Sequence, residues 1–116
     1  MDLKKDREFS ETPLDFIKDR VRNRQILWTY HVNMRLRKRS IGRSDILDSV
    51  ENYEIVESYP DDKYLPSYLI LTRKNEKTFH ILIAADLESK NVRIVTAYEP
   101  DPNEWSLDLK TRSNNK

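Results

Sequence analysis

The sequence predicts an α+β domain in which two to three N-terminal helices pack on a four-stranded antiparallel sheet. Apolar residues at helical spacing come first, and apolar residues that alternate or run together come later. Short polar connectors separate the last three apolar runs, so these runs are expected to form an antiparallel meander. An order of helices followed by strands is typical of an α+β layer arrangement.

The first half of the chain is expected to be helical, because its apolar residues recur every three to four positions after residues that favour a helix start. Thr12 is a good N-cap, and Pro13 suits the first helical position. The stretch 28–36 alternates as a strand would, but Thr29 is another good N-cap and strong helix formers follow it. Helices are therefore predicted over 13–24, 30–39 and 43–51.

The second half is expected to supply the sheet. Trp105 and Leu107 follow the last apolar run and are expected to fold back onto the body of the domain. Strands are predicted over 53–59, 68–73, 79–85 and 92–98. The domain organisation that follows is a flexible N-terminus over 1–12, one domain over 13–110 and a flexible tail over 111–116.

Composition excludes several classes of protein. The 116 residues include no cysteine and two histidines, so we expect no disulfide, no thiolate nucleophile and no metal site. A chain with one glycine cannot build a glycine-rich phosphate loop, so no nucleotide cofactor, or any other cofactor, is expected. No apolar run approaches the roughly 18 residues of a membrane span and no signal peptide is evident, which predicts a cytoplasmic protein without membrane contact.

Charge is unevenly distributed along the chain, although the net charge is only +1. From Lys18 to Arg43 there are nine basic residues and one acid, whereas from Asp45 to Asp62 there are seven acids and no base. Such segregation suits an anionic partner on one face of the molecule.

The main candidate site lies in the predicted helix over 30–39. His31, Arg35 and Arg39 fall at i, i+4 and i+8 and would share one face. An imidazole that titrates near neutral pH and two forked cations are the groups needed to move a proton and hold a phosphodiester. A solvated basic helix has the same pattern, so that alternative stays open. Further RNA contacts are predicted at Arg37, Lys38 and Arg43.

Aromatic and titratable residues of the predicted strands extend the candidate site. His80 and Tyr98 could supply a second proton-transfer group, and Tyr59 could stack on an unpaired base. By strand alternation, His80 points away from Phe79 and Ile81. The alternative is that His80 is a hydrogen-bonded structural residue and that the tyrosines are ordinary edge residues.

The stretch from Ile26 to Trp105 resembles a small bacterial family, domain of unknown function 4258. The residues that carry the resemblance are the histidine and arginines at four-residue spacing, Tyr59-Pro60 of the turn, and the closing Tyr98-x-Pro100. That family usually has glycine after the last arginine, where this chain has Ser40. The resemblance implies a fold similar to RelE- and barnase-like ribonucleases and a partner that is a zinc-finger antitoxin.

The leading functional hypothesis is therefore a toxin that cleaves RNA without a metal ion, by attack of the ribose 2′-OH. His31 would be the base or acid, and the two arginines would hold the phosphate. Two alternatives remain: a non-catalytic module that binds RNA or protein, and a degenerate toxin that serves as a partner subunit.

Overall fold

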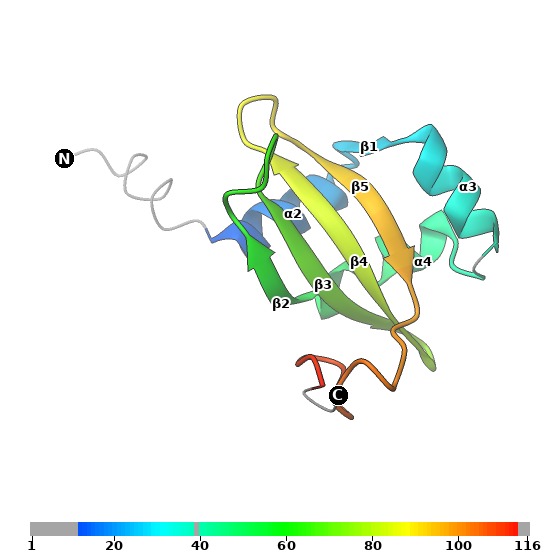
Figure 1. Cartoon of the computed structure of the whole chain (residues 1–116). Coiled ribbons are helices and arrows are strands. Elements are labelled where there is room, and N and C mark those ends of the chain that lie inside the picture. Colours follow the sequence, from blue (N-terminus) through cyan, green and yellow to red (C-terminus); the bar gives the residue numbers. More distant parts are fainter. Residues whose placement is uncertain (1–11, 39, 114–116) are drawn as a thin grey trace.

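The structure, a computed structural model, describes residues 12–38 and 40–113 (Figure 1). These residues form an α+β fold, as predicted, and none of the described helices is long and apolar enough to cross a membrane. The helices are α2 (Pro13–Arg22), α3 (Tyr30–Lys38), α4 (Arg43–Asp48) and the short 3-10 helix η1 (Val50–Asn52). The strands are β1 (Ile26–Trp28), β2 (Glu54–Tyr59), β3 (Ser67–Lys74), β4 (Lys77–Asp86) and β5 (Asn91–Tyr98). Of the N-terminus predicted to be flexible, all but Thr12 lies outside the described residues.

The sheet has five strands, in the order β1-β5-β4-β3-β2. Strands β2 to β5 pair antiparallel as predicted, whereas β1 pairs parallel with β5. The prediction of a four-stranded, wholly antiparallel sheet is therefore wrong. The physical reason is that β1 has only three residues, too few to show an alternation of their own. Its partners, from Val92 to Ile94, also lie far along the chain.

Each α-helix begins where nearby groups satisfy its first N–H donors. Thr12 Oγ1 accepts the N–H of Asp15 at 3.0 Å, which confirms Thr12 as the N-cap of α2. Thr29 has the same role for α3, where its hydroxyl accepts an N–H at 3.1 Å. The backbone of Gly42 caps α4, and Asp45 accepts the Gly42 N–H at 2.8 Å. Helix α2 ends earlier than predicted, and the predicted third helix divides into α4 and η1.

The turn after α3 contains Ser40 with a φ of 29°, in the left-handed region that favours glycine. Gly42, by contrast, has an extended backbone, with a φ of −103°. Lys77 Nζ donates to the Ser40 carbonyl at 2.5 Å, so the neighbouring hairpin holds the turn.

The hydrophobic core lies between one face of the sheet and the helices. Helices α2 and α4 lie behind the sheet in Figure 1, and their residues Ile17 and Ile46 are fully buried. Alternate residues of β4 complete the core from the sheet side: Phe79, Ile81 and Ile83. Helix α3 lies to one side and packs against β5. No helix of the described residues lies over the other face of the sheet (Figure 1).

Residues 99–113, which we call the clasp, return to the face of the sheet that has no helix. Trp105 is buried, which confirms that this part of the chain folds back. The same expectation for Leu107 is wrong, because its side chain is fully exposed. A turn closed by the Leu109 N–H to the Ser106 carbonyl, at 2.9 Å, places Leu107 at its tip.

The packed chain also extends past residue 110, into the predicted tail. Arg112 forms a β-bridge with Trp105, and its guanidinium lies 4.6 Å from the centroid of the Trp105 ring. Residues 114–116 of the predicted tail lie outside the described residues.

Candidate nucleic-acid interface

Helix α3 carries the histidine of the predicted motif. His31 lies in its first turn and is exposed, with its ring edge-on to Tyr30 at 6.2 Å between centroids. The helix buries Val32 and Leu36 on the side that faces the core. The cationic side chains of the motif lie outside the described part of the chain: Arg35, Arg37 and Lys38, together with all of Arg39.

Helix α3 lies beside the strand that ends at Tyr98. Strand β1 pairs only with Val92–Ile94, in the first half of β5, and the chain then enters α3. Helix α3 packs against β5, so it lies along the same edge of the sheet as β1, beyond the point where β1 ends (Figure 1). Tyr98 is half-buried, and it already has an interaction within the protein.

His80 lies in a closed environment beneath the clasp. Its ring is 0% exposed and meets Trp105 edge-on at 4.5 Å and Tyr98 edge-on at 5.7 Å between centroids. Nε2 lies 2.8 Å from the Leu109 carbonyl oxygen, so Nε2 carries the proton and donates it. Burial lowers the pKa of His80, which keeps the ring neutral. This position favours the structural alternative for His80, since substrate cannot reach the ring while Trp105 covers it.

A groove crosses the face of the sheet that has no helix. Its first part, which we call the tyrosine pocket, has a volume of about 300 Å³. The second part is a hollow of about 250 Å³ that shares Asp62, Ser67 and Leu82 with the first and continues to Thr29. The tyrosine pocket is lined by Tyr59, Asp62, Ser67, Leu69, Leu82, Thr96, Tyr98 and Arg112. The hollow adds Lys63, Tyr64, Leu65, Ala84, Arg93, Ile94 and Val95.

The groove therefore brings together two residues predicted from the sequence, Tyr59 and Tyr98, with others that were not. Asp62 is not among the predicted site residues, and Arg112 falls in the segment 111–116 predicted to be a flexible tail. A surface arginine in a polar segment gives no signal in the sequence, because only the fold shows that the clasp returns to β2.

A hydrogen-bonded group joins the clasp to one end of the groove. Arg112 Nε and Nη2 donate to the two oxygens of Glu57 at 2.8 and 3.2 Å, and the Tyr59 hydroxyl donates to the same carboxylate. The bond from Arg112 lowers the pKa of Glu57, and the bond to Glu57 raises the pKa of Tyr59. Tyr59 thus stays a neutral phenol with a fixed hydroxyl and an exposed ring.

Arg43, predicted to bind RNA, joins α4 to α3. Its guanidinium donates twice to Asn33 Oδ1, at 3.1 and 2.9 Å, and lies 4.7 Å from the centroid of the Trp28 ring. The side chain is exposed, so a phosphate can still approach it. Its contacts give it a structural role at the start of α4 whether or not it binds RNA.

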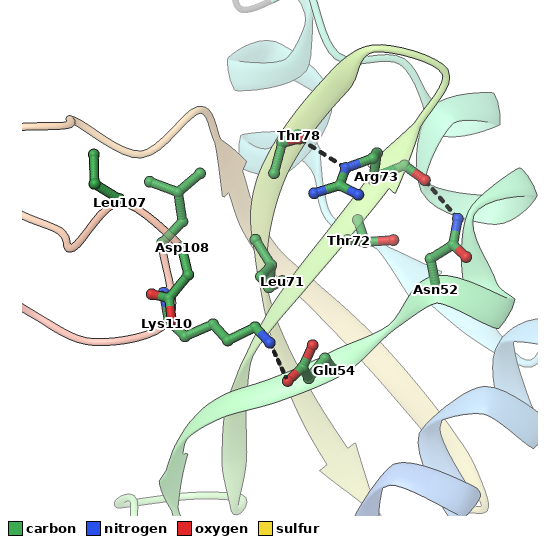
Figure 2. Close-up of a pocket in the computed structure, with 10 residues that line it drawn as sticks. Asn52, Glu54, Leu71, Thr72, Arg73, Thr78, Leu107, Asp108 and Lys110 are labelled. Atoms are coloured by element: carbon green, nitrogen blue, oxygen red, sulfur yellow. Dashed lines mark hydrogen bonds and ion pairs between the residues drawn. The ribbon is translucent and has the colours of Figure 1, made fainter.

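Another cleft, of about 550 Å³, lies between the clasp and the β2–β4 strands (Figure 2). None of the predicted site residues lines it. Its polar groups bond to one another: Lys110 to Glu54 at 3.0 Å, Arg73 to Thr78 at 3.2 Å, and Asn52 to the Arg73 carbonyl at 2.7 Å. Within the described residues, no group of three or more His, Asp or Glu side chains is arranged to hold a metal ion.

A protein-family model matches residues 28–99, more than half of the chain, and its description is Domain of unknown function (DUF4258). The chain belongs to the DUF4258 family. No curated protein and no solved structure matches it, so likeness to RelE- and barnase-like ribonucleases stays a prediction.

The DUF4258 match covers α3, α4 and all four antiparallel strands but neither α2 nor, apart from residue 99, the clasp. His31, Tyr59 and Tyr98 lie within the matched segment, whereas Arg112 does not. The part of the groove on the sheet therefore belongs to the DUF4258 segment, and the clasp closes one end of it from outside.

Proposed function

We propose that this DUF4258 chain is a metal-independent RNA endonuclease and the toxin of a type II toxin–antitoxin pair. The observation that carries the proposal is the course of the groove. It passes between Tyr59 and Tyr98, and it ends at Thr29, two residues before the exposed His31. An extended single strand could lie along it with its bases on the tyrosines and its backbone at α3.

The proposed reaction needs one base, one acid and cations around the phosphate. The ribose 2′-oxygen attacks phosphorus while His31 takes the 2′-OH proton. The bond from phosphorus to the 5′-oxygen breaks, and Tyr98 gives a proton to that oxygen. Products are a 2′,3′-cyclic phosphate and a 5′-hydroxyl. Tyr98 is preferred to His80 as the acid because it lines the groove, whereas His80 is covered by Trp105.

Arg35 and Arg39 are assigned to the phosphate from their spacing in the sequence. Guanidinium groups can bind a phosphate through two parallel N–H bonds, and their charge stabilises the phosphorane most strongly in the transition state. Conversion of His31 to alanine removes the base but not these cations. Binding of RNA is thus expected to survive in His31→Ala while cleavage falls by roughly 10²–10⁴-fold.

The test is a cleavage assay on purified protein with single-stranded RNA and EDTA. Wild type should produce fragments, His31→Ala should not, and Met34→Ala, at another exposed position of α3, should behave as wild type. Expression in cells should slow growth for wild type and Met34→Ala only, and the zinc-finger antitoxin should relieve it. Equal cleavage by wild type and His31→Ala would contradict the assigned role.

A non-catalytic RNA-binding module is the second candidate. It is favoured by the burial of His80, which leaves His31 as the accessible histidine of the two. This candidate predicts salt-sensitive binding of RNA without fragments. Intact RNA after incubation with wild type, together with a gel shift, would support it over the endonuclease.

A further inference from the structure

The tyrosine pocket is distinct in chemistry from a phosphate site. We propose that it binds one unpaired RNA base that carries an exocyclic amino group, as adenine, guanine and cytosine do and uracil does not. The proposal rests on the proposed function, in which RNA is the substrate. It adds a subsite and a base preference that the reaction itself does not require.

The size and lining of the pocket fit one flat aromatic ring. Its volume of about 300 Å³ lies at the small end of the range for ligand sites. Leu69 and Leu82, on the central strands, contribute apolar side chains to it. Tyr59 on β2 and Tyr98 on β5 lie on opposite sides of the row Leu69–Leu82–Thr96, because Tyr59 is in register with Ser67 whereas Tyr98 is in register with His80. A base can therefore lie on the apolar lining and contact Tyr59, and Tyr98 stays the proposed acid on the other side of the row.

The charges of the pocket select against a phosphate. Asp62 contributes a carboxylate, which would repel an anion, and the charge of Arg112 is balanced by its two bonds to Glu57. A neutral ring with N–H donors is the ligand that this combination favours. The phosphate next to the base would instead lie near Lys63 of the adjoining hollow, where Arg93 is already bonded to Asp86 at 3.2 Å.

Asp62 is held in place to accept hydrogen bonds. The Ser67 hydroxyl donates to one carboxylate oxygen at 2.7 Å, and the Lys63 N–H donates to the other at 3.0 Å. Ser67 is buried, so the first of these bonds fixes the carboxylate at the wall of the pocket. A carboxylate has about four acceptor positions, and these bonds leave some of them for an amino group of the base. In uracil a carbonyl oxygen takes the place of this amino group, so uracil offers the Asp62 carboxylate no N–H donor at that position.

The proposal can be tested without any cleavage. Backbone amide NMR spectra are recorded while wild type is titrated with AMP, UMP or ribose 5-phosphate, the last as a ligand with a phosphate but no base. AMP should shift the amides of Ser67, Leu82 and Thr96, and it should bind at least about tenfold more tightly than UMP, the usual effect of one hydrogen bond to a charged group. Equal shifts of these amides by ribose 5-phosphate would overturn the proposal.

Two variants and a matched control separate the parts of the pocket. Asp62→Asn should abolish the preference for AMP over UMP. The matched control is Asp61→Asn, which removes the same charge from the neighbouring residue. Asp61 does not line the pocket, so the preference for AMP should remain in this variant. Tyr59→Ala should weaken the binding of AMP at least about fivefold through lost stacking. A preference for AMP that persists in Asp62→Asn would show that the pocket does not read the amino group.

Failure of the subsite and failure of the proposed function give different results. RNA cleavage that depends on His31, with no response of the pocket amides to AMP, would reject the subsite and leave the endonuclease. AMP binding that depends on Asp62, with no cleavage of RNA, would support the subsite and reject the endonuclease.

Discussion

Burial of His80 predicts a pH dependence of stability that one substitution should remove. Nε2–H already donates to the Leu109 carbonyl, and Nδ1 has no hydrogen-bond partner among the described residues. A proton on Nδ1 would place a charge and an unpaired donor in a site that is 0% exposed. Burial thus lowers the pKa of His80 below its ordinary value of 6.5, the nearby Arg112 lowers it further, and the Leu109 bond and Glu57 oppose both.

The sign and size of the effect follow from proton linkage. Above pH 6.5 the ring is neutral in both states, and the full stability is present. Below about pH 6.5 the unfolded chain binds a proton that the folded chain does not, so the free energy of unfolding falls as the pH falls, until the folded pKa is reached. One proton gives a slope of at most about 1.4 kcal/mol per pH unit.

The assay is urea unfolding of wild type, His80→Gln and His31→Gln between pH 7.5 and 5.5. Carboxylates contribute little in this range, because their ordinary pKa values are near 4 and those of Glu57 and Asp45 are lowered further. Wild type should lose stability towards pH 5.5, and His80→Gln should lose much less. The other histidine is exposed, so His31→Gln is the matched control and should keep the wild-type dependence. A slope that persists in His80→Gln would show that His80 does not cause the pH dependence.

Two further substitutions test the packing of the clasp and the strain of the turn after α3. Trp105→Ala should lower the free energy of unfolding by about 3–5 kcal/mol in urea titrations, because it empties a buried site over His80; a change under 1 kcal/mol would show that the clasp adds little to the fold. Ser40→Gly should raise the melting temperature, with a gain of about 1 kcal/mol, because the φ of 29° costs serine but not glycine; a loss of stability would mean that the turn carries no such strain.

Local features of the fold were predictable, because the signals that specify them are local. The caps Thr12 and Thr29 lie within three residues of the groups that they bind, and the alternation of β4 identifies its core face without knowledge of the partners. The three residues of β1 show no such signal. Their place in the sheet depends on Val92–Ile94, and only the folded chain brings these segments together.

The candidate site was predictable only in part, for the same reason. His31, Tyr59 and Tyr98 are residue types that attract attention in a sequence, and the last two do line one groove. The cover over His80, and the place of Asp62 and Arg112 at the groove, depend on where the clasp and the β2–β3 loop come to lie. No spacing along the chain encodes those positions.

The ends of the products distinguish RNA cleavage by 2′-OH attack, with His31 as the base, from other routes of cleavage. A short RNA is incubated with purified wild type in EDTA, and its fragments are analysed by mass spectrometry beside the same RNA with 2′-O-methyl groups throughout. We expect 2′,3′-cyclic phosphate and 5′-hydroxyl ends from the unmodified RNA, and no cleavage of the methylated RNA or by His31→Ala. Fragments with 5′-phosphate ends, or cleavage of the methylated RNA, would contradict 2′-OH attack.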